Sequence, residues 1–154
     1  MKEIIEKLIK LNKTISTMES CTGGSLAGCI TNVEGSSEVF KFGAVTYSNE
    51  YKIRMGVNKN VIDEYSVYSM NTACEMSKSI SEFTNSNYGI GITGKLNRVD
   101  VNNLIGEDNL VYISIYDKDN DCYYNEEITV IYEIREENKK YVIDKVIELL
   151  RGVL

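Results

Sequence analysis

The chain has 154 residues, 43% of them hydrophobic, and a formal net charge of −6 at pH 7. This length suits one domain with a core of its own, and the negative charge argues against a broad nucleic-acid surface. No apolar run is long enough to span a membrane, and the start, Met1-Lys2-Glu3-Ile4, lacks the apolar core of a signal peptide. The sequence therefore predicts a cytoplasmic protein that binds neither nucleic acid nor membrane.

Histidine is absent, and the four cysteines, at positions 21, 29, 74 and 122, form no C-x-x-C motif. A zinc site and a disulfide framework are therefore not expected. The absence of histidine also excludes every Ser-His and Cys-His catalytic pair. Any general base must be a carboxylate, a lysine, a tyrosine or a water molecule.

Hydrophobic periodicity predicts the elements of the first half of the chain, in this order: an amphipathic helix at 2–11, a strand at 14–18, a helix at 25–31, a strand at 42–47, and short helices at 50–55 and 59–64. The second half is predicted to hold a helix at 70–83, a strand at 88–93, a polar loop at 94–109, strands at 110–116 and 122–132 around a hairpin turn, and a helix from 135 to 150. This order indicates one domain over residues 1–154. Its expected architecture is a three-layer α/β/α sandwich with a mixed, mostly parallel sheet and a C-terminal antiparallel hairpin.

A hydroxyl-rich bend joins the first predicted strand to the second helix. Ser20, Cys21 and Thr22 lie in it, followed by Gly23 and Gly24. Unpaired N–H groups at a helix start can hold a developing negative charge, and the strand–turn–helix order resembles a nucleophile elbow. The alternative interpretation is an ordinary glycine-containing loop without chemistry, in which Cys21 is a small packing residue.

Three other stretches are predicted to meet this bend: Gly35-Ser36-Ser37, residues 47–52 and Thr93-Gly94. In open α/β sheets, ligands bind beyond the carboxyl ends of the strands. Without histidine, Lys52 is the natural base, because a desolvated lysine loses its proton readily and can then activate a serine hydroxyl. The alternative for each stretch is structural: a solvated lysine, a half-buried strand tyrosine at position 47, turn residues at 36–37, and an ordinary strand end at 93–94.

Three motifs in the sequence resemble the CinA C-terminal domain family, also known as the nicotinamide mononucleotide (NMN) deamidases. They are Glu19-Ser20-Cys21-Thr22-Gly23-Gly24, Gly35-Ser36-Ser37, and the run from Val45 through Tyr47-Ser48-Asn49-Glu50 to Lys52. The resemblance covers nearly the whole chain and is densest over residues 14–94. It implies an α/β/α sandwich that hydrolyses the carboxamide of NMN to nicotinate mononucleotide and ammonia, with no metal or organic cofactor. It also implies the stand-alone form of the family, assembled as a homo-oligomer.

The resemblance also implies a role for each site residue. Ser20 is the implied nucleophile, Lys52 the base that activates it, and Tyr47 a catalytic residue that assists proton transfer. Arg135 would bind the phosphate or the carboxamide region of the substrate. The full set of implied substrate-binding residues is Thr22, Gly23, Gly24, Ser37, Ser48, Asn49, Thr93, Gly94 and Arg135.

Residues 95–109 depart from the family pattern, because a glycine-rich segment with prolines is replaced by a polar loop. Side chains on Lys95, Leu96 and Asn97 are expected to crowd the space that a nucleotide would occupy. Two alternatives to the deamidase follow. One is a catalytically degenerate domain that binds a nucleotide or a partner without turnover. The other is hydrolysis of a different amide, with Lys95 or Arg98 recognising a new anionic group.

Overall fold

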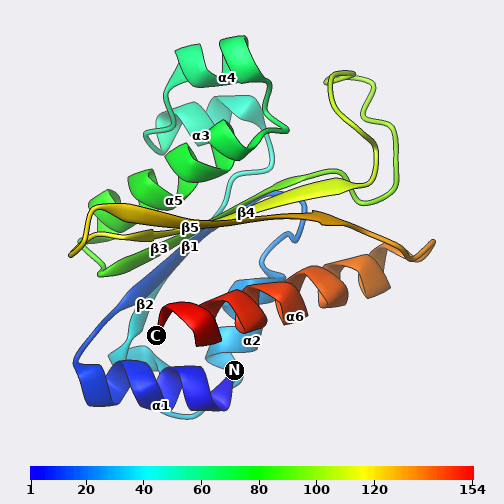
Figure 1. Ribbon diagram of the computed structural model, residues 1–154. Coiled ribbons are helices and arrows are strands. Elements are labelled where there is room, and N and C mark those ends of the chain that lie inside the picture. The colour runs from blue at the N-terminus through cyan, green and yellow to red at the C-terminus, as the bar shows by residue number, and fades with distance from the viewer.

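In the computed structural model, which describes residues 1–154, five strands form one mixed sheet between two layers of helices (Figure 1). The strand order is β2-β1-β3-β4-β5. β1 is parallel to β2 and β3, and β4 is antiparallel to β3 and β5, so β4 alone runs against the other four. The predicted α/β/α class with a mixed sheet and a C-terminal hairpin is confirmed. The strands are β1 (Ile15–Glu19), β2 (Phe40–Val45), β3 (Tyr88–Gly94), β4 (Leu110–Asp117) and β5 (Cys122–Thr129).

The helices divide between the two faces of the sheet (Figure 1). One face carries α1 (Lys2–Leu11), α2 (Ser25–Thr31) and α6 (Arg135–Val153). The other carries α3 (Asn49–Arg54), α4 (Lys59–Tyr65) and α5 (Met70–Thr84). None of these helices combines the length and the apolar character that crossing a membrane requires.

The larger core lies on the face of α1, α2 and α6 and contains 21 buried side chains. The amphipathic pattern of α1 explains its place there, since Ile4, Ile5 and Leu8 are all buried. Burial of each such side chain stabilises the fold by about 1.5–3 kcal/mol. A smaller cluster on the opposite face includes Met18 of β1 and Met76 of α5.

Two glycines of β3 allow α5 to pack directly on the sheet. A Cβ atom on Gly89 would lie 2.0 Å from the carbonyl oxygen of Ser77, and one on Gly91 would lie 2.3 Å from that of Ala73. Both distances are far shorter than any real carbon–oxygen contact, so only glycine fits at these two positions. The close packing fixes β3, whose carboxyl end carries one wall of the cavity described below.

Two strand predictions differ from the structure by two residues or more at an end, and the other three differ by a single residue at one or both ends. The strand predicted at 42–47 is β2 at Phe40–Val45, and the strand predicted to reach position 132 ends at Thr129. The physical reason for the second difference is Asn138 of α6, which is buried. Its side chain accepts the backbone N–H of Tyr132 at 2.9 Å and donates to the Tyr132 carbonyl at 2.7 Å. Tyr132 therefore has no backbone group left for a strand partner.

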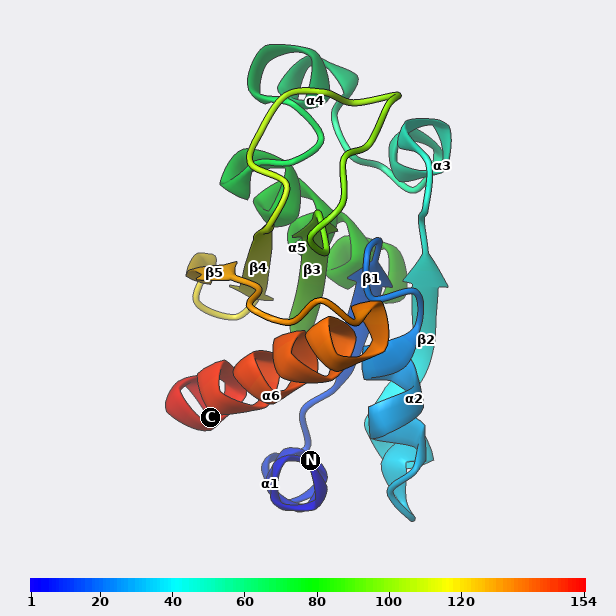
Figure 2. The ribbon, with the colours of Figure 1, turned by 90° about the vertical axis from the view of Figure 1, so that its right-hand side faces the viewer.

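The carboxyl ends of β1, β2 and β3 lie at the same edge of the sheet because the three strands are parallel. Ser20, directly after β1, donates its N–H to Ile92 of β3 at 3.0 Å, and Thr46, directly after β2, donates to Glu19 at 2.9 Å. Figure 2 shows residues 95–109 arching above the carboxyl end of β3. The turns that follow these three strands therefore lie next to one another at this edge.

Candidate functional site

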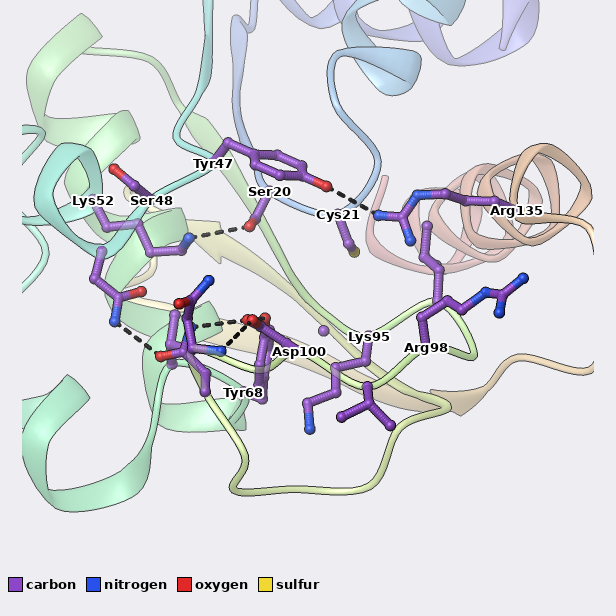
Figure 3. Close-up of a pocket in the computed structure, with 17 residues that line it drawn as sticks. Ser20, Cys21, Tyr47, Ser48, Lys52, Tyr68, Lys95, Arg98, Asp100 and Arg135 are labelled. Atoms are coloured by element: carbon purple, nitrogen blue, oxygen red, sulfur yellow. Dashed lines mark hydrogen bonds between the residues drawn. The ribbon is translucent and has the colours of Figure 1, made fainter.

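A cavity of about 610 Å³ opens at this edge of the sheet (Figure 3). It is lined by 17 residues, which come from the turns after β1 and β2, from the end of β3 and the loop that follows it, from α3, from the connection between α4 and α5, and from the start of α6. The structure brings together seven of the twelve residues to which the resemblance assigned a role: Ser20, Tyr47, Ser48, Asn49, Lys52, Gly94 and Arg135.

Ser20 and Lys52 form a hydrogen-bonded pair in this cavity (Figure 3). The Nζ atom of Lys52 lies 3.1 Å from the Ser20 Oγ and donates to the carbonyl oxygen of Thr46 at 2.8 Å. The Lys52 side chain is almost fully buried, with 1% of its surface exposed. Burial lowers the pKa of Lys52 to about 8, because the charged form loses its hydration. Lys52 therefore has a substantial neutral fraction near neutral pH, as a general base requires.

The local sequence explains why Lys52 faces inward. Ser48 caps α3, and its hydroxyl accepts the N–H of Tyr51 at 3.3 Å. Lys52 is the buried residue of this short helix. The interpretation of Lys52 as a solvated lysine is therefore wrong.

Glu19, the last residue of β1, organises the bend that carries Ser20. Its carboxylate is 1% exposed and accepts four hydrogen bonds. The donors are the Thr22 hydroxyl at 2.7 Å and the N–H groups of Gly24, Leu26 and Ala27 at 3.1, 3.1 and 2.8 Å. These amides belong to the start of α2, so Glu19 satisfies the groups that a helix N-terminus leaves unpaired. The sequence carried one signal for this role, a carboxylate at the end of an otherwise buried strand.

The N–H groups of the two glycines in this bend are therefore engaged within the chain. Gly24 donates to Glu19, and Gly23 donates to the carbonyl oxygen of Ser20 at 3.0 Å. By contrast, the N–H groups of Cys21 and Thr22 donate no hydrogen bond within the chain. Free amide donors thus directly follow Ser20 and precede the two glycines.

Arg135 and Tyr47 meet at the cavity although 88 residues separate them in sequence (Figure 3). The guanidinium of Arg135 donates to the Tyr47 hydroxyl oxygen at 3.1 Å. Cys21 also lines the cavity, but burial raises the pKa of its thiol to about 12. The thiol stays protonated at neutral pH, so the Ser20 hydroxyl is the better candidate nucleophile of the two.

Five residues that the resemblance assigned to substrate binding do not line the cavity. Thr22 is buried and bonded to Glu19, and the Thr93 hydroxyl donates to the Val67 carbonyl at 2.9 Å. Ser37 is exposed in a short 3₁₀ helix that precedes β2, so it lies at the opposite end of that strand from Tyr47. The residues outside the cavity are Thr22, Gly23, Gly24, Ser37 and Thr93.

Residues 95–109 border the cavity, and of the three side chains expected to crowd it, Lys95 and Leu96 belong to its lining. Lys95 turns away from Ser20 (Figure 3), and its Nζ donates to Gly106 and to Asp108, both at 3.0 Å. Leu96 is buried in the larger core. Asn97 is exposed and donates to the carbonyl oxygen of Tyr132.

The same loop is fixed at the cavity by Asp100, which sequence reasoning missed. Its carboxylate accepts the Tyr68 hydroxyl, the Asn102 N–H at 2.9 Å and the Asn103 amide at 2.9 Å. Asn103 in turn accepts from Asn49 at 3.2 Å. Hydrogen bonds from Tyr68 and Asn103 lower the pKa of Asp100, so its charge persists at neutral pH.

The family model of the CinA C-terminal domain matches residues 1–154. Proteins named competence-damage inducible protein from Clostridium acetobutylicum and Clostridium botulinum (strain Langeland) are 50% identical over 88 residues and 47% identical over 96 residues. These matches cover 56% and 61% of this chain, but only 21% and 24% of the relatives' own length.

Solved structures agree with the fold. A CinA superfamily protein from Escherichia coli superposes with a TM-score of 0.88 at 23% identity, over 99% of this chain and 87% of that one. The competence/damage inducible protein CihA from Agrobacterium tumefaciens gives a TM-score of 0.84 at 27% identity, over 98% of this chain and 93% of that one. The match of the family model over all 154 residues shows that the chain belongs to the CinA C-terminal domain family.

Proposed function

We propose that this chain is an amidohydrolase that converts NMN to nicotinate mononucleotide and ammonia by a Ser-Lys mechanism. The observation that carries the proposal is the pair formed by Ser20 and Lys52, whose Oγ and Nζ atoms lie 3.1 Å apart in an open cavity. A serine becomes nucleophilic beside a base that is neutral near physiological pH. The cavity volume of about 610 Å³ falls within the range of small-ligand sites.

The first half of the reaction makes an acyl-enzyme. Neutral Lys52 accepts the proton of the Ser20 hydroxyl while Oγ forms a bond to the carboxamide carbon. The electron pair of the C=O bond moves to oxygen, and the free N–H group of Cys21, which lines the cavity, is the candidate for stabilising this oxyanion. The Lys52 ammonium then gives its proton to the amide nitrogen. The C–N bond breaks, and ammonia leaves.

The second half releases the acid. Water attacks the ester carbon while Lys52 takes its proton, and the C–O bond to Ser20 breaks as Lys52 returns that proton to Oγ. Serine and neutral lysine are regenerated, and the product carries a new carboxylate. Tyr47, which accepts from Arg135, lies at the cavity as a second group for proton transfer.

The test is ammonia release from NMN by the purified protein. The wild type is expected to turn over, whereas Ser20→Ala and Lys52→Met are expected to lose at least about 1000-fold in kcat. Matched controls are Ser79→Ala on α5 and Lys59→Met on α4, neither of which lines the cavity. Absence of ammonia release from the wild type would overturn the proposal. Calorimetric binding of NMN in that case would favour the alternative of a domain that binds without turnover.

A further inference from the structure

Arg98 is a cavity-lining cation without a partner in the chain. It lies in the segment that departs from the family pattern, and its side chain is exposed. No hydrogen bond or ion pair involves its guanidinium, whereas Lys95 of the same segment is neutralised by Asp108. Of the two cations that the sequence offered for a new anionic group, only Arg98 is free to bind one.

The loop holds Arg98 in place by bonds on both sides of it. Lys95 is fixed by Gly106 and Asp108, and Asp100 is fixed by Tyr68 and Asn103. The backbone N–H of Arg98 itself donates to the carbonyl oxygen of Asp108 at 3.2 Å. Such bonds reduce the conformational entropy that the loop would lose on binding a ligand.

The charge balance of the cavity favours an anion. Its lining contains Lys52, Lys95, Arg98 and Arg135 but only one carboxylate, that of Asp100. The Asp100 oxygens already accept three hydrogen bonds from the chain. This excess of positive charge occurs in a protein whose net charge is −6, so it is a local feature of the site.

The two arginines lie away from the reacting groups. Figure 3 shows Arg98 and Arg135 on the side of the cavity opposite to Lys52. Arg135 donates one hydrogen bond to the Tyr47 hydroxyl, whereas the Arg98 guanidinium donates none within the chain. A substrate whose amide reacts at Ser20 would therefore extend toward Arg98.

We propose that Arg98 binds the phosphate monoester of the nucleotide substrate and thereby selects phosphorylated substrates over the corresponding nucleosides. The planar guanidinium offers two parallel donors that match two phosphate oxygens. The identity of the substrate as a nicotinamide nucleotide rests on the proposed amidohydrolase function. Its anion-binding part stands on the geometry of the cavity alone.

The test measures binding without turnover. In the Ser20→Ala background, calorimetry compares NMN with nicotinamide riboside, which lacks the phosphate. Arg98→Ala is expected to weaken NMN binding by about 10- to 100-fold and to change riboside binding less than about twofold. Arg98→Lys is expected to restore part of the loss. Arg54→Ala, which removes the same charge outside the cavity, is the control and is expected to bind both ligands normally.

Two results would overturn the proposal: an unchanged NMN affinity in Arg98→Ala, or an equal loss for NMN and the riboside. Ribose 5-phosphate serves as a third probe, because its binding does not depend on the amide reaction. If the wild type releases no ammonia from NMN but binds ribose 5-phosphate in an Arg98-dependent manner, the amidohydrolase proposal fails and the phosphate site stands. In turnover, Arg98→Ala should raise KM and leave kcat nearly constant.

Discussion

The carboxylate of Glu19 accepts the backbone N–H of Ala27 at 2.8 Å, which joins the end of β1 to the first turn of α2. Three other donors converge on the same carboxylate, and all four bonds lie within eight residues of sequence. The bend that carries Ser20 is therefore shaped by a buried carboxyl group on the residue directly before it.

Replacing this carboxylate by an amide should damage both stability and catalysis. Three of the four donors converge on Oε2 and the fourth on Oε1, so the NH₂ group of Glu19→Gln would face at least one N–H donor that it cannot accept. We expect a loss of about 2–3 kcal/mol in the free energy of unfolding and a lower kcat. Urea denaturation and the ammonia assay measure the two effects. Glu38→Gln, at an exposed position, is the control, and equal stability of the two variants would contradict the assigned role.

The rate should depend on the protonation of Lys52. Burial lowers its pKa to about 8, and only the neutral amine can take the Ser20 proton, so kcat/KM should rise with pH and level off above about pH 8. Near pH 7 about one tenth of the molecules would hold the neutral form. A pH–rate profile from about pH 6 to pH 9.5 tests this expectation. A rate that falls as the pH rises through 8 would exclude Lys52 as the base.

Lys52→Met should stabilise the protein while abolishing turnover. A pKa lowered from 10.5 to about 8 corresponds to about 3 kcal/mol of cost for the charged form in the fold. Methionine removes that cost but leaves the Thr46 carbonyl without its donor, so we expect a net gain of about 1–2 kcal/mol at pH 7. Because the folded pKa is below the unfolded one, the wild type itself gains stability between about pH 8 and pH 10.5. The stability advantage of Lys52→Met over the wild type should therefore be smaller at about pH 9 than at about pH 7. Thermal unfolding of both proteins at the two pH values measures this advantage.

The contact between α5 and β3 yields a matched pair of glycine substitutions. In Gly91→Ala the new Cβ would lie 2.3 Å from a backbone carbonyl of α5, and neither backbone can move without breaking the packing. We expect a loss of about 3 kcal/mol or failure to fold. At Gly28, in α2, a Cβ meets nothing within 4 Å, so Gly28→Ala should stabilise by up to about 1 kcal/mol. Chemical denaturation measures the free energy of unfolding of both variants. A loss in Gly91→Ala alone would show that the close packing of α5 on β3, and not the added methyl group as such, causes the destabilisation.

The sequence predicts those parts of the fold that depend on local patterns. The bounds of α1 and α2 agree with the prediction, because an apolar stripe and flanking polar residues define each of them. The predicted end of β5 was wrong because the observed end depends on hydrogen bonds between the Asn138 side chain and the Tyr132 backbone. These bonds form only once α6 has packed on the sheet.

The candidate site was predictable only in part, for the same reason. The absence of histidine and the family motif pointed to Ser20 and Lys52 before any coordinates. No local pattern, however, distinguishes the engaged Lys95 from the free Arg98, since both are cations in a polar loop. The four hydrogen bonds that the Glu19 carboxylate accepts likewise depend on the position of the first turn of α2 in the folded protein.

The ion pair between Lys95 and Asp108 joins the two ends of the loop above β3. Residues between these ends can change in length and composition while β3 and β4 keep their places, since the closure of the loop is set at its base. The stretch that carries Arg98 is therefore separate in sequence from the two that carry Ser20 and Lys52, although all three line one cavity.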